Sequence, residues 1–201
     1  VSIGAHPSFN DKENFGRKRL NLSSVEIKKL ITEQIGIISD IAKSKKIKVT
    51  HIKPHGALNN MACEDYELAK IISETIKKIN KDLIFLVPTG SEMEKTGNKI
   101  GLKVAAEIFA DRNYEDNGNL VSRSKKNAMI TDPRIAENHV IKMVRNQAIN
   151  CYSGKQIACD IDSICVHGDG ISAVNTAKQI KKGLLKSGVT LLALDRMKKF
   201  I

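Results

Sequence analysis

Side chains that can transfer protons or bind anions follow directly after four short apolar runs of this chain. They are His6, His55, Asp111, Arg112, His167 and Asp169. Imidazole gains and loses a proton near neutral pH, and a neighbouring carboxylate can fix its orientation. The residue types therefore predict acid–base chemistry on a bound substrate, with basic side chains available for anionic groups.

The loop around His55 has the most specific pattern of the four. Pro54 makes the backbone rigid before this histidine and Gly56 makes it permissive after it, so the imidazole can be directed from a strand end into a cleft. Lys53 adds a cation for an anionic group, and Asn59 adds an amide for a hydrogen bond. The pattern favours a functional histidine, and a purely structural one is the alternative.

The pair His167 and Asp169, separated by one glycine, follows an apolar run too short for a helix and typical of a buried strand. The two side chains can orient one another or share a metal ion, although two ligands do not make a metal site. Asp111 and Arg112 allow two interpretations. They form a surface ion pair, or Arg112 holds a carboxylate while Asp111 orients a histidine or a water molecule.

The first loop combines His6 with Asp11 and with a Gly-Arg pair that ends at Arg17, which permits close approach to an anionic group. The other two histidines carry weaker signals. His51 alternates with Lys53 along the same strand and indicates a core or supporting role. His139, in the middle of a predicted helix, indicates a structural or exposed residue.

The apolar runs predict six strands, and helical periodicity predicts helices between them. The strands are expected at residues 1–6, 47–53, 83–87, 104–110, 163–167 and 189–194, with a short additional strand near 156–159. The helices are expected at residues 23–44, 62–79, 133–150 and 171–186, and a long loop at 114–132. Ser23 with Glu26 predicts a capping box, and Ser91 predicts a helix cap rather than an anion site.

Strands that alternate with helices imply a parallel sheet, and the carboxyl ends of such strands carry the chemistry of α/β enzymes. About six βα units are visible in 201 residues, fewer than the eight of a full barrel. We therefore predict an α/β fold with one domain over residues 1–201. It is an incomplete, TIM-type β/α barrel-like domain that lacks one or two βα units at its N-terminus.

Composition limits the classes of partner. The formal net charge is +11, but the excess is mostly lysine scattered along helix faces, and the few aromatic residues do not interleave with basic clusters. These features argue against a nucleic-acid partner and are compatible with an anionic small molecule. The 4 cysteines form no CxxC pair, and no apolar run is long enough to span a membrane, so we predict a cytoplasmic protein without a membrane partner.

The motifs GAHPSFND, NFGR, EQIG, KPHGALNN, EIFADRNYEDNGNLVSR and SICVHGD occur in this order from Ser2 to about Leu194. Together they resemble the family of 5-oxoprolinase A subunits, also called LamB/YcsF. The resemblance implies a β/α barrel-like fold related to the glycoside hydrolase/deacetylase barrels. It also implies a hydrolase that works with two partner subunits, B and C, and cleaves the cyclic amide 5-oxoproline to L-glutamate, coupled to ATP hydrolysis.

The resemblance further implies that the chain is a fragment, because family members typically carry a DLNxDxGE strand and a CGxHxGD segment upstream of GAHP. Local departures from the family pattern concern the rim of the expected pocket. They fall at Asn14, Lys18, Asn59 and the stretch that begins at Gly170.

On this family interpretation, His55 and His167 are the candidates for proton transfer, and Asp111 and Asp169 orient them or a water molecule. His6 is a further catalytic candidate. The candidates for substrate binding are Lys53, Arg17, Arg112 and Asn59. ATP is expected as a co-substrate bound mainly by the partner subunits, because the chain has no Walker motif and no GxGxxG.

Two alternatives stay open. A metal-dependent hydrolase of the carbohydrate deacetylase type would place His6, His55, His167 and Asp169 around one divalent ion, so the use of a metal stays undecided. A non-catalytic subunit that holds partner enzymes together is the other alternative.

Overall fold

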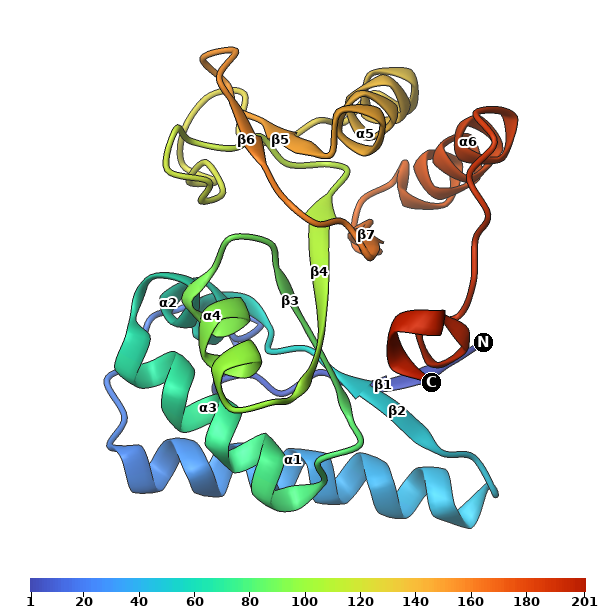
Figure 1. The fold of residues 1–201 in the computed structure, drawn as a ribbon. Helices are drawn as coiled ribbons and strands as arrows, with labels where there is room; N and C mark the ends of the chain where they lie inside the picture. Colours follow the sequence, from blue (N-terminus) through green and yellow to red (C-terminus); the bar gives the residue numbers. More distant parts are fainter. The chain divides into compact units, whose positions relative to one another are not determined.

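The computed structural model describes residues 1–201. Its internal contacts divide the chain into two compact units, shown in Figure 1. The first unit consists of Val1–Ala105 and Ala193–Ile201, and the second of Ala106–Leu192. The single domain expected over residues 1–201 stays a prediction.

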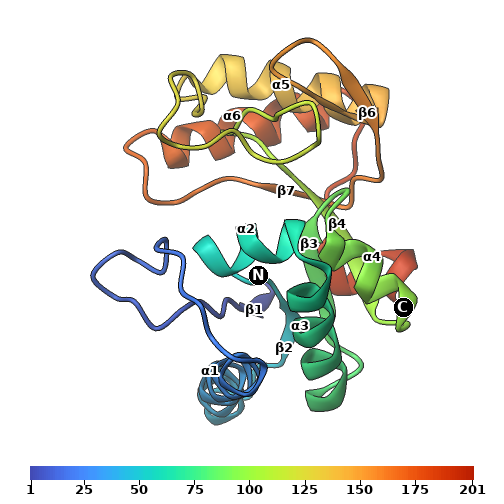
Figure 2. The ribbon, with the colours of Figure 1, turned by 90° about the vertical axis from the view of Figure 1, so that its left-hand side faces the viewer.

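In the first unit, parallel strands are covered by helices. The strands are β1 (Ile3–Ala5), β2 (Val49–Ile52) and β3 (Ile84–Pro88), and the helices are α1 (Ser24–Ser44), α2 (Gly56–Glu64), α3 (Tyr66–Ile79) and α4 (Glu92–Lys99). Gly4 of β1 pairs with His51 of β2, which pairs in turn with Ile84 of β3. Helix α3 packs against both α1 and α4 (Figure 2).

Apolar side chains at strand and helix spacing form the core of the first unit. On α3, the fully buried Ile72 and Ile76 lie one turn apart and pack with Phe85 and Val87 of β3. Burial of each such side chain contributes roughly 1.5–3 kcal/mol. The last residues form two short 3₁₀ turns, η1 (Leu194–Arg196) and η2 (Lys198–Phe200), and Phe200 packs in a second cluster of the same unit.

The helix caps predicted at Ser23 and Ser91 are confirmed. The Glu26 amide donates to the Ser23 hydroxyl over 3.3 Å, and the Ser23 amide donates to the Glu26 carboxylate over 2.7 Å, which completes the capping box. Ser91 caps α4 by accepting a hydrogen bond from the Glu94 amide over 3.2 Å. The helix expected at residues 62–79 is two helices, because Asp65 leaves helical geometry and caps α3.

The second unit contains β5 (Ala148–Asn150), β6 (Gln156–Ala158), β7 (Ser163–Cys165), α5 (Pro133–Asn146) and α6 (Ala173–Lys186). Strand β4 (Lys103–Phe109) begins in the first unit and ends in the second. The strand order of the sheet is β1-β2-β3-β4-β7, and β5 and β6 form a separate antiparallel pair. Phe109 lies opposite Cys165 in the parallel pairing of β4 and β7, so these two strands end at the same edge.

Helices α5 and α6 lie side by side in the second unit (Figures 1 and 2). Val140 of α5 and Ile180 of α6 are buried in one apolar cluster. Gly183 permits the close approach, because a Cβ atom at this position would overlap the Glu137 carboxylate. The same carboxylate accepts a hydrogen bond from the Gln179 amide over 2.7 Å, which ties the two helices together.

The prediction of a strand at residues 189–194 is wrong. After α6 the chain turns at Gly188, and the Val189 amide bonds back to the Leu184 carbonyl, so it is not available for a strand ladder. Leu191 and Leu192 remain exposed, at 44% and 58%. The helix expected at 133–150 ends earlier, because Gln147 adopts a left-handed conformation and β5 follows.

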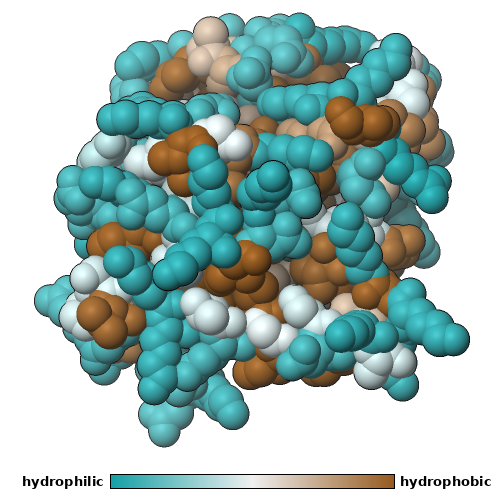
Figure 3. Space-filling view, turned by 60° about the horizontal axis from the view of Figure 1, so that its bottom comes forward, coloured by the Kyte–Doolittle hydropathy of each residue, from teal (hydrophilic) through white to brown (hydrophobic).

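The surface is largely hydrophilic on the face drawn in Figure 3, where hydrophobic residues form separate groups between hydrophilic side chains. This distribution agrees with lysines spread over solvated helix faces. No helix combines the length and the apolar character needed to cross a membrane.

Candidate functional site

The first cluster of predicted site residues lies where β1 and β2 end. Parallel pairing continues past both strands, since the Lys53 amide donates to the Ala5 carbonyl over 3.0 Å and the His55 amide to the Pro7 carbonyl over 2.8 Å. This pairing places the His6 and His55 rings 4.8 Å apart, edge to face. His6 Nδ1 lies 2.6 Å from the Lys53 carbonyl, an acceptor, so this nitrogen carries the proton.

The loop after His6 returns to His55. Phe15 meets the His55 ring edge to face at 5.2 Å, and the Arg17 guanidinium lies 5.2 Å from the Phe15 ring centroid. His55 Nδ1 lies 3.3 Å from the Ser8 hydroxyl. The structure therefore brings together His6, His55 and Arg17 at the ends of these strands, and their roles in a site stay a prediction.

Two backbone features hold this loop in place. The Ala57 amide at the start of α2 donates to the Gly16 carbonyl over 2.9 Å. Gly56 has a φ of 61°, and a Cβ atom there would overlap the same Gly16 carbonyl oxygen. Only glycine fits this position without strain, since it combines a left-handed conformation with a close backbone approach.

Gln34 of α1 is a positioning residue that the sequence analysis missed. Its amide oxygen accepts a hydrogen bond from the Ser8 amide over 3.0 Å, and its amide nitrogen donates to the Ser8 carbonyl over 2.7 Å. Ser8 is thereby fixed beside His55 from the neighbouring helix. The one signal in the sequence was that Gln34 belongs to the EQIG motif; nothing local indicates its partner, because the contact spans 26 positions.

Asn59 lies inside the first unit, with 5% of its surface exposed. Its amide nitrogen donates to Asn60 over 3.3 Å and approaches the Cys63 sulfur at 3.8 Å, while its oxygen is buried without a partner. Burial also raises the pKa of Cys63 to about 12, so the thiol stays neutral. A substrate contact for Asn59 and for the half-buried Lys53 stays a prediction.

The second cluster lies in the second unit, where β4 and β7 end. His167 Nδ1 lies 2.8 and 2.9 Å from the two carboxylate oxygens of Asp111, and the His167 amide donates to the same carboxylate over 3.2 Å. The Phe109 ring stacks on the imidazole with 5.8 Å between centroids. The structure thus supports the second interpretation of Asp111, in which this carboxylate orients a histidine.

The hydrogen bonds from His167 keep Asp111 ionised. Burial alone would raise the pKa of Asp111, but the side-chain and backbone hydrogen bonds from His167 together lower it below its usual value. Because an ionised carboxylate can only accept, His167 Nδ1 carries the proton and its Nε2 is the acceptor. That is the tautomer of a general base.

The Asp111–His167 pair opens on a cavity of about 240 Å³. Its walls come from both strand ends, the loop that precedes α5 and the start of α6. The lining residues are Asp111, Arg123, Met129, Ile130, Thr131, Val166, His167, Asp169, Gly170, Ser172, Ala173 and Thr176. Asp169 therefore lines the same cavity as His167, and the expectation that the two side chains orient one another or share a metal ion stays a prediction.

Arg112 does not line this cavity. Its side chain is buried, with 4% exposed, and donates to the Val121 carbonyl over 2.6 Å. These contacts tie the loop at residues 114–132 to the end of β4. A role for Arg112 in holding a substrate carboxylate stays a prediction.

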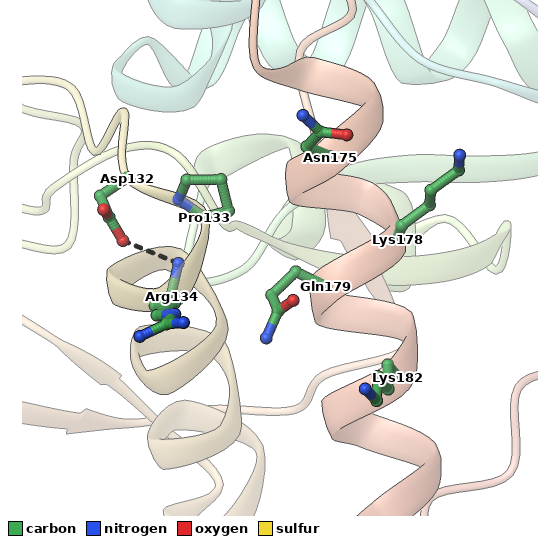
Figure 4. Close-up of a pocket in the computed structure, with 7 residues that line it drawn as sticks. All are labelled: Asp132, Pro133, Arg134, Asn175, Lys178, Gln179 and Lys182. Atoms are coloured by element: carbon green, nitrogen blue, oxygen red, sulfur yellow. Dashed lines mark hydrogen bonds between the residues drawn. The ribbon is translucent and has the colours of Figure 1, made fainter.

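Figure 4 shows a second cavity of about 390 Å³ between the start of α5 and the exposed side of α6. Asp132 caps α5 by accepting a hydrogen bond from the Arg134 amide over 2.8 Å. Lys178 and Lys182 come from α6. None of the predicted site residues lines this cavity.

No group of three or more His, Cys, Asp or Glu side chains is placed to hold a metal ion. Within the first unit the predicted ligands are His6 and His55, and within the second they are His167 and Asp169. His51 is half-buried and its pKa is lowered by burial, which fits the supporting role expected for it.

Comparisons with known proteins agree with one another. The LamB/YcsF family profile matches residues 1–199. The A subunit of a 5-oxoprolinase from Clostridium beijerinckii is 46% identical over 197 residues, which cover 98% of this chain and 77% of the relative. The corresponding 5-oxoprolinase protein of Staphylococcus carnosus is 38% identical, over 96% of this chain and 77% of the relative.

A solved structure is similar as well. It is the crystal structure of a lactam utilization protein from Thermus thermophilus, with a TM-score of 0.87 and 34% identity over 96% of this chain and 77% of that one. Together with the parallel strand order, this similarity confirms the predicted β/α, barrel-like fold class.

Proposed function

This chain belongs to the LamB/YcsF family, and we propose on that basis that it is the A subunit of a 5-oxoprolinase, a hydrolase that opens a cyclic amide. The names of its relatives and of the similar solved structure support the proposal, because both refer to a lactam or to an oxoprolinase. The observation that carries the proposal is the Asp111–His167 pair at the edge of a small cavity.

The geometry suits hydrolysis of a ring amide. Water must add to the ring carbonyl, the C–N bond must break, and the nitrogen must take up a proton. Asp111 holds the Nδ1 proton of His167, so Nε2 is the nitrogen that acts on the substrate. Nε2 takes a proton from the attacking water and then gives it to the leaving nitrogen. Asp169 orients the attacking water in the same cavity.

The first cluster contributes binding in this proposal. His6 and His55 lie together, and Arg17 lies beside them over Phe15. We assign Arg17 and Lys53 to anionic groups of the reactants and His55 to a second proton transfer. The close packing of aromatic rings around His55 supports a fixed imidazole, which proton transfer requires.

Hydrolysis of an unstrained lactam is unfavourable, so we propose that it is coupled to ATP through two further subunits, B and C. These partners bind the nucleotide, since this chain contains no Walker motif. A cytoplasmic location belongs to the same proposal and is supported by four free cysteines. No specific observation favours a metal-dependent deacetylase.

The proposal is tested with the complete complex. The full-length protein, its two partner subunits, 5-oxoproline and ATP are combined, and L-glutamate and ADP are measured with and without His167→Ala. We expect the unaltered complex to form glutamate and the variant to lose about 10²–10⁴-fold in kcat, the usual contribution of a general acid–base residue. Lys182→Gln, which removes an exposed charge outside the Asp111–His167 cavity, is the control.

Two results would count against this proposal. If the unaltered complex formed no glutamate, the proposed reaction would be wrong. Unchanged turnover in a correctly folded His167→Ala complex would leave the reaction in place but remove the assignment of the Asp111–His167 pair.

A further inference from the structure

Arg123 is a basic residue that the sequence analysis left without a role, and it lines the same cavity as Asp111, His167 and Asp169. It lies in the loop between β4 and α5, not on a strand end. It is also the only lysine or arginine among the residues of this cavity. The lining of this cavity therefore contains one permanently charged basic side chain.

The guanidinium of Arg123 makes no hydrogen bond or ion pair within the protein. Its basic neighbours differ. Lys125 pairs with Glu115 over 2.8 Å, and Arg112 donates to the Val121 carbonyl. A cation that lines a cavity and is left unpaired by the fold is available for an anionic ligand.

The backbone around Arg123 is held on both sides. Before it, Val121 is buried and its amide donates to the Asn113 carbonyl over 2.9 Å. After it, the Lys125 amide donates to the Ser122 carbonyl over 2.9 Å and closes a turn. The turn fixes where the arginine side chain leaves the loop, so less conformational entropy is lost when it binds a ligand.

The charges of the cavity indicate what Arg123 binds. Asp111 is matched by its hydrogen bonds with His167, and Asp169, the other carboxylate of the cavity, has an interaction of its own, so neither takes up the arginine. The cavity of about 240 Å³ lies below the roughly 300–1,000 Å³ of pockets for drug-sized ligands, so it suits a small molecule. A planar guanidinium binds a carboxylate through two parallel hydrogen bonds.

We propose that Arg123 binds the carboxylate of the substrate and thereby selects lactams that carry one. The inference rests on the proposed function, since 5-oxoproline is a small lactam with a single carboxylate. With that group on Arg123, the ring amide is left for His167, which lines the same cavity. Arg123 is thus a specificity-determining residue, and His167 is the group that reacts.

The test compares 5-oxoproline with 2-pyrrolidinone, the same ring without the carboxylate. In the complete complex with ATP, we expect Arg123→Gln to raise KM for 5-oxoproline about 10- to 100-fold, the range for loss of a charged hydrogen-bond pair. KM for 2-pyrrolidinone should not change, whereas Arg123→Lys should fall between the unaltered protein and Arg123→Gln. Lys126→Gln removes one charge from the same loop without touching the cavity and is the matched control.

Direct binding separates this inference from the proposed function. Binding of 5-oxoproline to the complex without ATP is followed by calorimetry, which requires no turnover. Loss of binding in Arg123→Gln but not in Lys126→Gln supports the inference even if glutamate never forms. Equal binding by Arg123→Gln, or no preference of the unaltered protein for 5-oxoproline over 2-pyrrolidinone, would overturn it.

Discussion

The Asp111–His167 pair shows how two residues acquire a function that neither has alone. Asp111 follows β4 and His167 follows β7, 56 positions later, and parallel pairing of these strands brings them within hydrogen-bond distance. The Asp111 carboxylate accepts a hydrogen bond from one imidazole nitrogen of His167, so the other nitrogen can exchange protons with a substrate. Asp111 therefore depends on His167 for its lowered pKa, and His167 depends on Asp111 for its tautomer.

Asp111→Asn tests this dependence. An asparagine of nearly the same shape can donate its amide to His167 Nδ1, which favours the tautomer that cannot act as a base toward the cavity. We expect kcat for glutamate formation by the complete complex to fall about 10²–10⁴-fold with little change in KM. Asp82 is an exposed aspartate in the first unit, so Asp82→Asn should leave kcat unchanged and serves as the control. Normal activity of the Asp111→Asn complex would contradict the role of Asp111 in orienting His167.

His139 predicts a pH dependence of stability. Burial lowers its pKa, against a smaller opposite effect of a hydrogen bond with the Arg112 backbone, and its Nε2 is buried without a partner. The unfolded chain therefore binds a proton more readily, with a pKa of about 6.5. The resulting stability is complete above that value and is lost as the pH falls toward the folded pKa.

The measurement is urea unfolding of the full chain at about pH 7.5 and pH 5.5. We expect the free energy of unfolding to decrease between the two pH values and His139→Leu to reduce that decrease. His51, whose pKa burial also lowers, should account for part of the remainder. Identical pH slopes for the unaltered protein and the variant would show that His139 has no such role.

At the scale of elements, local signals in the sequence predicted most of the fold. Five of the six predicted strands, the additional strand near residues 156–159 and the capped start of α1 are present. These elements depend on periodicity and capping, which act within a few residues. The break at Asp65 was missed because apolar spacing continues across it, while its cap depends on a local backbone conformation.

Long-range contacts were not predictable in the same way. The apolar run at residues 189–194 resembles a strand, but a strand also needs a free edge to pair with, and Val189 bonds back to α6 instead. For the site, the residue types at the strand ends indicated His6, His55, Asp111 and His167. The positions of Arg123 and Gln34 depend on a loop and a helix face, for which the sequence carries no periodic signal.

Replacement of Gly56 and of Gly36 by alanine should change the free energy of unfolding in opposite directions. In Gly56→Ala the new Cβ atom overlaps the Gly16 carbonyl oxygen, and the alanine must adopt the left-handed φ of 61° that Gly56 has. We therefore expect a loss of at least about 1–2 kcal/mol in the free energy of unfolding. Gly36→Ala lies inside α1 with nothing within 4 Å of the new Cβ, so we expect a gain of about 0.5–1 kcal/mol. Denaturant unfolding measures both, and destabilisation of similar size in the two variants would refute the distinction.

Loss of the N-cap of α1 should have a smaller effect on the free energy of unfolding. Ser23→Ala removes the acceptor for the Glu26 amide, and we expect a loss of about 1 kcal/mol, within the range for N-cap serines. Ser39→Ala, within the same helix, serves as the control. A change in Ser23→Ala no greater than in Ser39→Ala would mean that Glu26 alone maintains the helix start.

At the scale of the whole molecule, the absence of a phosphate-cradling motif predicts dependence on partners. We expect the full-length protein alone, given ATP and 5-oxoproline, to form neither ADP nor glutamate, and the complete complex to form both. Chromatographic measurement of ADP and glutamate checks this. ADP formation by the isolated protein would show that it binds and hydrolyses the nucleotide itself.

The close approach of α5 to α6 leaves no room for a side chain at Gly183 unless the Glu137 side chain moves. Thr176 lines the Asp111–His167 cavity seven positions earlier on the same helix, about 10 Å along its axis. A methyl group at position 183 would overlap the end of the Glu137 side chain, so this carboxylate must turn away, and its hydrogen bond with the Gln179 amide is disturbed. Gly183→Ala therefore acts first on the link between α5 and α6, and α6 is the helix that also supplies part of the wall of the cavity.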